Sequence, residues 1–510
     1  MAVSKVYSAQ NDISNSSVIE IESDLSRGLF SFAIVGLPDK AVAEAKDRVS
    51  AAIKNSGLES PKSRNKKVVI SLAPADIKKE GPSFDLPIAL SYLLSSGEMN
   101  FDPKNKMFLG ELALNGDIKK IKGVLPAAIL AKKKGFTEIF VPKENADEAS
   151  LVDSLKVFGV DNLKEIVNHF RKGSEFKKEL VEWERGKQKR DEDEFNNDFS
   201  YIKGQSLAKR ALEIAAAGGH NVLFFGPPGT GKTMLAKAFT TILPDLYHEE
   251  MLETTSIHSI AGILNSERIS RPPFRSPHHT SSHVSIVGGG TNLRPGEITL
   301  AHNGVLFLDE FPEFDRRVIE SLREPLEEGK ISVSRAKGTA VFPAKIILVA
   351  AMNPCPCGNY GSSRQCNCSP INIQRYQKKI SGPILDRIDL IVSVEELKRT
   401  ELSNEKSETP SREIKKKIEM ARSFQKERFK NLGFKYSMNN DIRPNHIKEG
   451  SLIEEKAFDL LLRSSEKLSL STRAFHRMIR VARTIADLDM SERVTSTHIL
   501  EALQFRGKIF

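Results

Sequence analysis

Apolar positions along the first third of the chain follow two alternating rhythms. The run at residues 30–38 (FSFAIVGLP) is followed by the helical periodicity of residues 41–57, and then by the runs at 66–76 (KKVVISLAPAD), 85–97 (DLPIALSYLLSSG) and 136–146 (FTEIFVPKENA). Regular interleaving of strands and helices is typical of an α/β or α+β domain. We therefore predict such a domain over residues 1–170.

A stretch that is dense in charge of both signs and poor in aliphatic residues follows at residues 171–199. Because this composition cannot bury a core of its own, we expect an exposed helix or a linker here. Either structure marks a domain boundary.

Strand and helix patterns return over residues 200–395. Buried-strand runs occur at residues 221–225 (NVLFF), 304–310 (GVLFLDE) and 344–353 (AKIILVAAMN). Such runs suit the strands of a parallel sheet that is covered on both faces. We predict a central α/β domain built on this sheet.

The last region, residues 396–510, has helical periodicity and little strand signal. Residues 455–468 and 473–488 show the helical pattern most clearly. We predict an all-helical lid here, and hence a multidomain α/β chain with an N-terminal α+β domain, a central parallel-sheet domain and this lid.

A glycine-rich loop lies between the apolar run at 221–225 and a helical segment. Its sequence, GPPGTGKT, matches G-x-x-x-x-G-K-T. The glycines allow backbone N–H groups to point at phosphate oxygens, while the lysine reaches the β- and γ-phosphates and the threonine hydroxyl ligates Mg²⁺. The predicted ATP-binding residues are Gly226, Pro227, Pro228, Gly229, Thr230, Gly231, Lys232 and Thr233.

Polar side chains follow two of the other buried runs. Asp309 and Glu310 end GVLFLDE, and Asn353 ends AKIILVAAMN. We expect Asp309 to hold Mg²⁺ through water, Glu310 to polarise the attacking water, and Asn353 to orient the same water. The alternative for Asp309 and Glu310 is a pair of solvated acids at an ordinary strand end. The alternative for Asn353 is a helix or turn cap at Asn-Pro.

Two arginines complete a pattern that resembles AAA+ ATPases. Arg387, in SGPILDRIDLIV, stands where these proteins carry the arginine finger that reaches a neighbour's ATP; a local pair with Asp386 or Asp389 is the alternative. Arg473 stands at the sensor-2 position, and Arg477 and Arg480, within two turns of it, are the alternatives. A site shared head-to-tail closes into a ring, and a hexamer is expected for this class.

Two segments rich in cations interrupt the central domain. Residues 267–304 are rich in Gly, Pro, Ser, His and Arg, which favours a loop into the pore of a ring. Residues 329–346 alternate and turn back, which predicts a β-hairpin. Positive charge suffices for sequence-independent contact with a phosphate backbone, although solvated cations are the alternative. The candidate DNA contacts are Arg271, Arg275, Arg294, Arg335 and Lys337, while His278, His279 and His283 suggest either a metal site or capping and solvated residues.

The segment RPPFRSPHHTSSHVSIVGGGTNLRPGEITLAHNGVLFLDEFPEF resembles the magnesium-chelatase-like branch of AAA+ ATPases. With FAIVGLPDKAVAEAKDRVSAAIKNSG and the loop CPCGNYGSSRQCNC, the resemblance narrows to the ComM/YifB family. It implies a hexameric ATPase that binds DNA and drives branch migration during natural transformation. It also implies the roles given above for Lys232, Asp309, Glu310, Asn353, Arg387 and Arg473.

The N-terminal region also resembles the proteolytic domain of Lon, a fold of the ribosomal-protein-S5 type. KKEGPSFDL places Ser83 at the position of Lon's nucleophile, but Leu125 stands where Lon needs its catalytic lysine. A shifted alignment would bring in Lys122. Since a serine without a base is a poor nucleophile, we expect a non-proteolytic domain.

All four cysteines of the chain, Cys355, Cys357, Cys366 and Cys368, lie in one loop with the spacing C-x-C-x₈-C-x-C. Two pairs of thiols around a turn suit a tetrahedral structural Zn²⁺ site. Metal binding contributes about 10–16 kcal/mol to the folding of such small knuckles. The alternatives are four reduced thiols in a flexible loop or a redox-sensitive cluster.

Composition changes this interpretation little. Hydrophobic residues make up 39% and charged residues 28%, the start lacks a signal-peptide pattern, and no apolar run is long enough to span a membrane, so we expect a cytoplasmic protein. The net charge of +10 favours a polyanion as partner, most often nucleic acid.

We therefore expect a DNA-translocating ring ATPase. The competing hypotheses are a chelatase-like protein-remodelling ATPase and an ATP-dependent protease.

Overall fold

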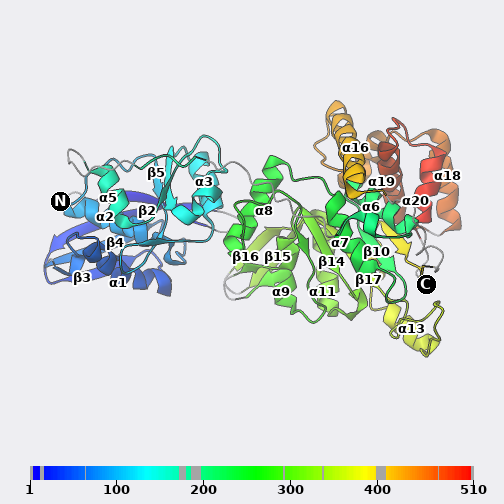
Figure 1. Cartoon of the computed structure of the whole chain (residues 1–510), viewed down its shortest axis with the longest axis horizontal. Coiled ribbons are helices and arrows are strands. Elements are labelled where there is room, and N and C mark those ends of the chain that lie inside the picture. The colour runs from blue at the N-terminus through cyan, green and yellow to red at the C-terminus, as the bar shows by residue number, and fades with distance from the viewer. Residues whose placement is uncertain are drawn as a thin grey trace. The chain divides into compact units, whose positions relative to one another are not determined.

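The computed structural model in Figure 1 describes residues 4–11, 16–63, 65–171, 180–184, 197–290, 293–335, 338–397, 409–468 and 470–506. The chain folds into two compact units. The first comprises residues 1–190 with 251–269, and the second comprises residues 191–250 with 270–510. The boundaries predicted from sequence, at 170, 199 and 395, remain predictions.

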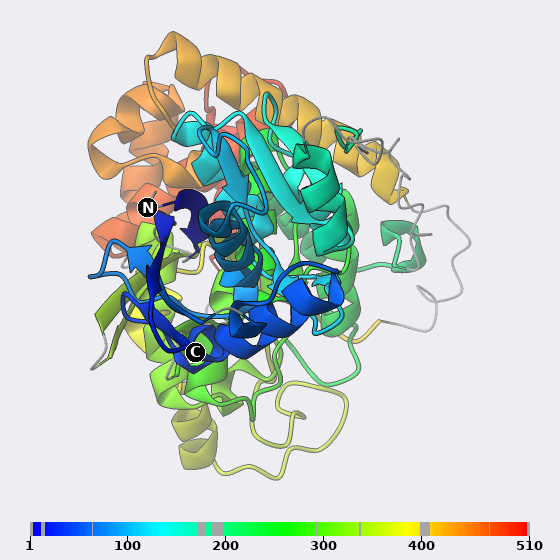
Figure 2. The ribbon, with the colours of Figure 1, turned by 90° about the vertical axis from the view of Figure 1, so that its left-hand side faces the viewer.

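The first unit is built on a mixed sheet with the strand order β3-β4-β2-β1-β5-β8-β9. Its strands are β1 (Ser4–Gln10), β2 (Ser17–Arg27), β3 (Ser31–Val35), β4 (Lys66–Ala73), β5 (Lys106–Phe108), β8 (Glu138–Pro142) and β9 (Lys156–Val160). Strand β2 is antiparallel to β1 and β4, and the other pairs are parallel. Figure 2 shows this unit from a second direction.

Helices of the first unit bury apolar faces against this sheet. They are α1 (Lys40–Asn55), α2 (Asp85–Ser96), α3 (Val124–Lys133), α4 (Ala146–Ala149) and α5 (Leu163–Phe170). Asp39 caps α1 by accepting a hydrogen bond from the backbone N–H of Val42, and α1 packs residues spaced three and four apart into the core. Asp85 at the start of α2 is fully buried in a bidentate pair with Arg48.

Part of a helix from the middle of the chain also belongs to the first unit. Helix α8 (His248–Ala261) follows the P-loop helix in sequence, but residues 251–269 pack with the N-terminal residues. The hydroxyl of Ser259 donates to the buried carboxylate of Glu148, which also accepts the backbone N–H of Leu125 at 2.8 Å. Leu252 packs against the apolar cluster of the first unit that contains Leu125.

The second unit contains a parallel sheet with the order β11-β14-β17-β10-β18. Its strands are β10 (Val222–Phe225), β11 (Phe274–Arg275), β14 (Gly304–Leu308), β17 (Ile346–Met352) and β18 (Leu390–Ser393). Nearly every residue of β10, β14 and β17 is buried, which explains the continuous apolar runs of the sequence. The predicted parallel sheet is confirmed.

Helices and a hairpin complete this unit. The helices of this part of the chain include α6 (Ser206–Gly218), α7 (Lys232–Ile242), α11 (Arg316–Ser321), α12 (Arg323–Glu328), α13 (Pro370–Gln377) and α14 (Gly382–Leu385). The predicted hairpin is confirmed: β15 (Lys330–Arg335) runs antiparallel to β16 (Gly338–Pro343). Its tip, with Lys337 and the side chain of Arg335, lies outside the described residues.

The C-terminal region is helical, as predicted. It contains α16 (Ser411–Asn431), α17 (Ile447–Ser451), α18 (Glu455–Lys467), α19 (Thr472–Leu488) and α20 (Ser496–Gln504). One apolar cluster runs from the sheet into these helices. Within them, the buried carboxylate of Asp487 binds Arg428 and Arg483. Among the described residues, no helix is both long and apolar enough to cross a membrane.

Candidate functional site

The P-loop begins where β10 ends, between the carboxyl ends of β17 and β18. At Gly226 a Cβ atom would lie 2.1 Å from the carbonyl oxygen of Val394, so only glycine fits beside the end of β18. Gly229 and Gly231 have φ values of 82° and 90°, a region that glycine enters without strain. The loop then passes directly into α7, whose N-terminal end favours anions.

Lys232 joins the P-loop to the end of β17. Its amine donates to the carbonyl oxygens of Gly226 and Pro227, both at 2.7 Å, and to Oδ1 of Asn353 at 3.2 Å. Burial lowers the pKa of Lys232 to about 8, although the Asp309 carboxylate acts in the opposite direction. Asn353 therefore lies beside the phosphate-binding loop, where the sequence predicted it.

Thr233 and Asp309 converge on one point. The Thr233 hydroxyl donates to Oδ2 of Asp309 at 2.7 Å, which links the first turn of α7 to the end of β14. Mg²⁺ prefers oxygen ligands together with several waters, and this hydroxyl and carboxylate match that preference. Thr233 and Asp309 would hold a bound Mg²⁺, which would neutralise negative charge on the phosphates of a nucleotide.

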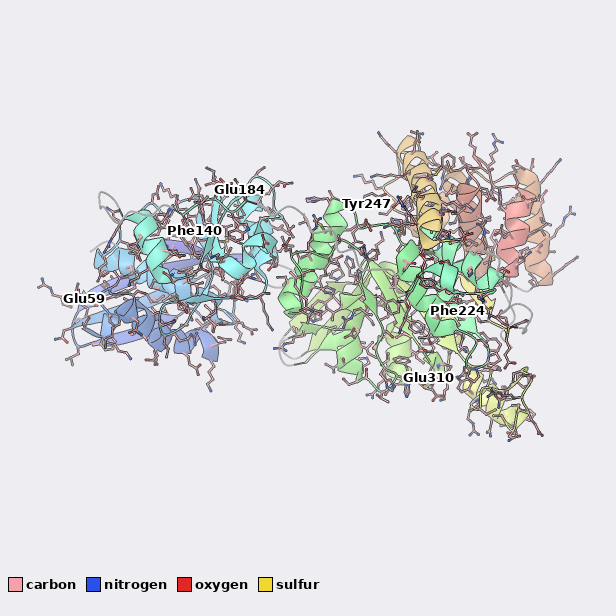
Figure 3. The ribbon with its side chains drawn as sticks, viewed as in Figure 1. Glu59, Phe140, Glu184, Phe224, Tyr247 and Glu310 are labelled. Atoms are coloured by element: carbon pink, nitrogen blue, oxygen red, sulfur yellow. The ribbon has the colours of Figure 1, made fainter. Side chains whose placement is uncertain are left out.

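Glu310 follows in a strained conformation. Its φ is 51°, and its backbone N–H donates to Oδ1 of Asp309 at 2.9 Å. Figure 3 labels Glu310 beyond the end of β14. Nδ1 of His279 lies 2.9 Å from Oε2 of Glu310, so His279 orients this carboxylate. Sequence reasoning missed this role, because the histidines of the 267–304 segment suggested only a metal or capping.

Arg387 forms neither of the local pairs considered from the sequence. Its guanidinium binds Glu327 and donates to the carbonyl oxygen of Pro383, while Asp389 lies 3.4 Å from Arg477 instead. Arg477 is buried in that pair, and burial lowers its pKa to about 10 despite Asp389. Arg473 is half-exposed and binds Glu327 as well.

Arg387 and Arg473 lie at the end of the sheet opposite to the P-loop. Val222, the first residue of β10, pairs with Leu390, and the side-chain amide of Asn221 donates to the carbonyl oxygen of Arg387 at 3.0 Å. Four strand residues, roughly 13 Å, separate this level from the P-loop. Because Arg473 shares Glu327 with Arg387, it lies on the same side. Among the described residues, no hydrogen bond or ion pair joins either arginine to the P-loop.

The four cysteines form one cluster. The sulfur of Cys355 lies 3.4 Å from that of Cys357 and 3.7 Å from that of Cys366, and all four sulfurs lie within 4.8 Å of one another. Zinc–sulfur bonds of about 2.3 Å in a tetrahedron place sulfurs about 3.8 Å apart. The cluster therefore fits a structural zinc site.

The pKa values of the clustered thiols favour a bound cation. The backbone N–H of Asn359 and the neighbouring thiols lower the pKa of Cys357 to about 6. The backbone N–H of Cys368 favours a second thiolate at Cys366, but burial and the other sulfurs raise the pKa of Cys366 to about 12. Several thiolates can coexist here only when a metal balances their charge.

The cysteine loop contacts the P-loop directly. Gly358 has a φ of 83°, and a Cβ atom at this position would lie 2.7 Å from Cδ of Pro228. The side-chain amide of Gln377 in α13 donates to the carbonyl oxygen of Pro354 at 3.2 Å and ties the loop to the following helix. The loop therefore supports the wall of the phosphate site.

The candidate DNA contacts differ in availability. Arg275 forms two hydrogen bonds with Glu297, at 2.6 and 2.8 Å, whereas Arg294 is exposed. Sequence reasoning missed a pocket of about 620 Å³ between α11 and α13. Its lining combines apolar and cationic side chains, among them Phe314, Ile319, Arg316, Arg375, Lys378 and Lys379.

Most cations of this pocket lack a counter-charge. Lys379 pairs with Glu313 at 2.8 Å, but Arg316, Arg375 and Lys378 are exposed and form no ion pair within the part of the chain that the structure describes. These three unpaired cations, beside the apolar side chains that line the pocket, suit the binding of a polyanion.

The protease hypothesis finds no support in the first unit. Ser83 lies in a short turn at Pro82–Phe84, and no lysine amine bonds to its hydroxyl among the described residues. Leu125, at the position of the missing base, is fully buried.

The sheet order, the P-loop and the paired acids define a P-loop ATPase domain of the magnesium chelatase type. A family model described as "Magnesium chelatase, subunit ChlI" matches residues 198–402, "Subunit ChlI of Mg-chelatase" matches residues 21–145, and "Magnesium chelatase, subunit ChlI C-terminal" matches residues 408–506. The chain is thus a magnesium-chelatase-like AAA+ ATPase.

Full-length relatives define the family more closely. The chain is 42% identical over 513 residues to "Competence protein ComM" of Haemophilus influenzae, covering 100% of this chain and 98% of that protein. It is 41% identical over 506 residues to "Uncharacterized protein YifB" of Escherichia coli, covering 97% and 95%. "DNA replication licensing factor mcm-6" of Caenorhabditis briggsae is 24% identical over 335 residues, covering 59% of this chain and 35% of that protein. The chain belongs to the ComM/YifB family.

Proposed function

We propose that this protein is an ATP-driven motor that assembles into a ring, expected to be a hexamer, and moves along single-stranded or branched DNA. One observation supports the ring above all others. The phosphate and magnesium ligands lie at the carboxyl end of the sheet, whereas Arg387 and Arg473 lie at its amino end. This separation supports a neighbouring subunit as the source of the arginines that neutralise the γ-phosphate.

Within one site, each residue has a separate role. Lys232 binds the β- and γ-phosphates, and Thr233 and Asp309 hold Mg²⁺. Glu310 accepts a proton from the attacking water, and Asn353 orients that water from the end of β17. His279 keeps the Glu310 carboxylate in place.

Two observations support DNA as the polymer along which the motor moves: the charge of the chain and the names of its relatives. The chain carries a net charge of +10, and the pocket between α11 and α13 offers three unpaired cations among its described residues. The β15–β16 hairpin would carry Arg335 and Lys337 toward the channel of a ring. The names of two relatives refer to competence and to DNA replication, and integration of incoming DNA during natural transformation is the process that we propose.

Displacement of a labelled strand from a three-way DNA junction tests this function. We expect displacement with ATP and magnesium, and none in Glu310→Gln, which retains nucleotide binding but lacks the base. Tight DNA binding without any ATP-dependent strand movement would contradict the proposal.

A protein-remodelling ATPase is the second candidate, because the family models describe a chelatase subunit. Single-stranded DNA should stimulate ATP hydrolysis only in a DNA motor. Arg375→Glu with Lys378→Glu should abolish that stimulation while DNA-free hydrolysis stays unchanged. Lys416→Glu, at an equally exposed position of α16, is the matched control.

For the cysteine loop we propose one structural Zn²⁺ per chain. Metal analysis of the purified protein should find about one zinc per chain, and Cys366→Ser should lose it. Purified protein with four titratable thiols and no zinc would support the reduced-thiol alternative.

A further inference from the structure

Glu327 binds two arginines that are far apart in the sequence. It lies in α12, and its Oε2 atom contacts the guanidinium of Arg387, from the turn before β18. Its Oε1 atom contacts the guanidinium of Arg473, in the first turn of α19. One carboxylate thus uses both of its oxygens to hold the two arginines that the proposed function assigns to a neighbour's nucleotide.

The three side chains of the cluster differ in their exposure to solvent. The side chain of Arg387 is 9% exposed, whereas those of Arg473 and Glu327 are 42% and 45% exposed. Nε of Arg387 is buried without a hydrogen-bond partner among the described residues. An approaching anion therefore reaches Arg473 and the carboxylate first, and Arg387 behind them.

The charges explain why the arginines stay together. Two guanidinium groups repel each other, and this repulsion grows as solvent is excluded, so an anion between them is required. Partial burial acts to raise the pKa of Glu327, but the hydrogen bonds and charges of Arg387 and Arg473 outweigh it and lower the pKa below its ordinary value. The carboxylate therefore remains charged, and the cluster has a net charge of +1.

We propose that Glu327 is an internal substitute for the terminal phosphate of ATP: it positions Arg387 and Arg473 as a pair within one subunit, and the γ-phosphate of a neighbour's ATP displaces it. This inference rests on the proposed action of both arginines across a subunit contact. Carboxylate and phosphate oxygens compete for the same N–H donors, because both accept hydrogen bonds from guanidinium forks. Glu327 is a positioning residue that sets how much ATP is needed before subunits join.

Removal of the negative charge of Glu327 should lower the ATP concentration at which subunits join. Glu327→Gln keeps the shape of the side chain but leaves the arginine pair with a net charge of +2, which attracts a neighbour's triphosphate more strongly. We expect the ATP concentration at half-maximal assembly to fall about five-fold. A purely structural role would lower the melting temperature and weaken assembly instead.

Sedimentation of the full chain at graded ATP concentrations measures this effect. All variants are made in a Glu310→Gln background so that ATP is not consumed. The matched control is Glu328→Gln, because Glu328 is the next residue of α12 but pairs with Lys330 at 2.9 Å. This control should leave the midpoint, which is the ATP concentration at half-maximal assembly, unchanged. An unchanged or raised midpoint in Glu327→Gln would overturn the proposal.

A second variant covers the case in which Glu327→Gln does not fold. Glu327→Asp keeps the charge but is one methylene shorter, so it cannot hold both arginines at once. We expect a smaller shift in the same direction. A midpoint identical to that of the Glu310→Gln parent would count against a bridging role.

Arg387→Ala separates this proposal from the proposed function. If Arg387→Ala abolishes ATP-dependent assembly and Glu327→Gln has no effect, only the role of Glu327 fails. If assembly survives Arg387→Ala, the shared site itself is wrong and the role of Glu327 falls with it. In Arg473→Ala, the effect of Glu327→Gln should shrink, because one of the two competing contacts is gone.

Discussion

The backbone of Glu310 has a φ of 51°, in the left-handed region that residues other than glycine rarely occupy. Such a conformation costs about 1 kcal/mol or more. Here it sets the Glu310 N–H against the Asp309 carboxylate and the side chain against His279. Backbone strain of this kind is found most often at functional sites, which agrees with the catalytic role proposed for Glu310.

Two substitutions separate strain from chemistry at this position. Glu310→Gly and Glu310→Ala both remove the carboxylate, and we expect both to abolish hydrolysis, but only glycine relieves the strain. We expect Glu310→Gly to unfold with a free energy about 1 kcal/mol higher than Glu310→Ala. Chemical denaturation of both variants measures the difference, and equal stabilities would mean that the backbone at this position is relaxed.

Lys232 should make ATP binding sensitive to pH in a range where lysine is normally insensitive. Its pKa is lowered to about 8 by burial, so the amine loses its proton as pH rises above 8. The phosphates of ATP favour the charged amine and raise its pKa again. Binding therefore takes up a proton above pH 8, and affinity should fall by up to about ten-fold per pH unit there.

Calorimetry in two buffers of different ionisation enthalpy measures this proton uptake. We expect close to no proton at about pH 7 and close to one at about pH 9. The same lysine opposes folding while it is charged, so its removal in Lys232→Met should raise the unfolding free energy at about pH 7 more than at about pH 10. ATP affinity that is equal at these lower and higher pH values would contradict this account.

At the scale of elements, the cysteine loop and the P-loop act together. A methyl group at Gly358 would press on Pro228, whereas Gly361 has the same kind of backbone, with a φ of 75°, and a methyl group there would meet nothing within 4 Å among the described residues. Gly358→Ala and Gly361→Ala should therefore cost similar backbone strain. Only Gly358→Ala should weaken ATP binding, by roughly ten-fold, measured by calorimetry with zinc content as the check. Equal ATP affinities in the two variants would show that the loop does not support the site.

Elements with a strong local signal were predicted correctly from the sequence. The strand β14 and the hairpin β15–β16 follow directly from runs and alternations of apolar residues. The membership of residues 251–269 in the first unit was not predictable. It depends on Ser259 meeting the buried Glu148, a contact between segments that no local pattern encodes.

At the scale of the whole molecule, the sequence predicted which residues lie near the P-loop but not which residue holds Arg387 and Arg473. The motifs identified Lys232, Asp309 and Asn353 because each ends or follows a buried strand, and the carboxyl ends of parallel strands meet at one edge. Glu327 carries no such signal, since it is one acidic residue among several on α12. The role proposed for Glu327 can be inferred only from the folded chain, in which three segments that are distant in the sequence come together.

Mixing two inactive variants tests whether the site is shared between subunits. Lys232→Ala lacks a functional P-loop but can donate Arg387, and Arg387→Ala has the opposite defect. Each alone should hydrolyse little ATP. In mixed rings about a quarter of the contacts pair an intact P-loop with an intact arginine, so an equal mixture should recover up to about a quarter of the wild-type rate.

The control replaces one partner by the double variant Lys232→Ala with Arg387→Ala, which can complete no contact with Lys232→Ala and should restore nothing. Mixed assembly is verified by sedimentation of differently labelled subunits. If mixed rings form and remain inactive, Arg387 acts within its own chain. The pairing of Val222 with Leu390, at the far end of the sheet from the P-loop, favours restoration of activity. The mixing ratio that gives the highest rate should be close to one to one.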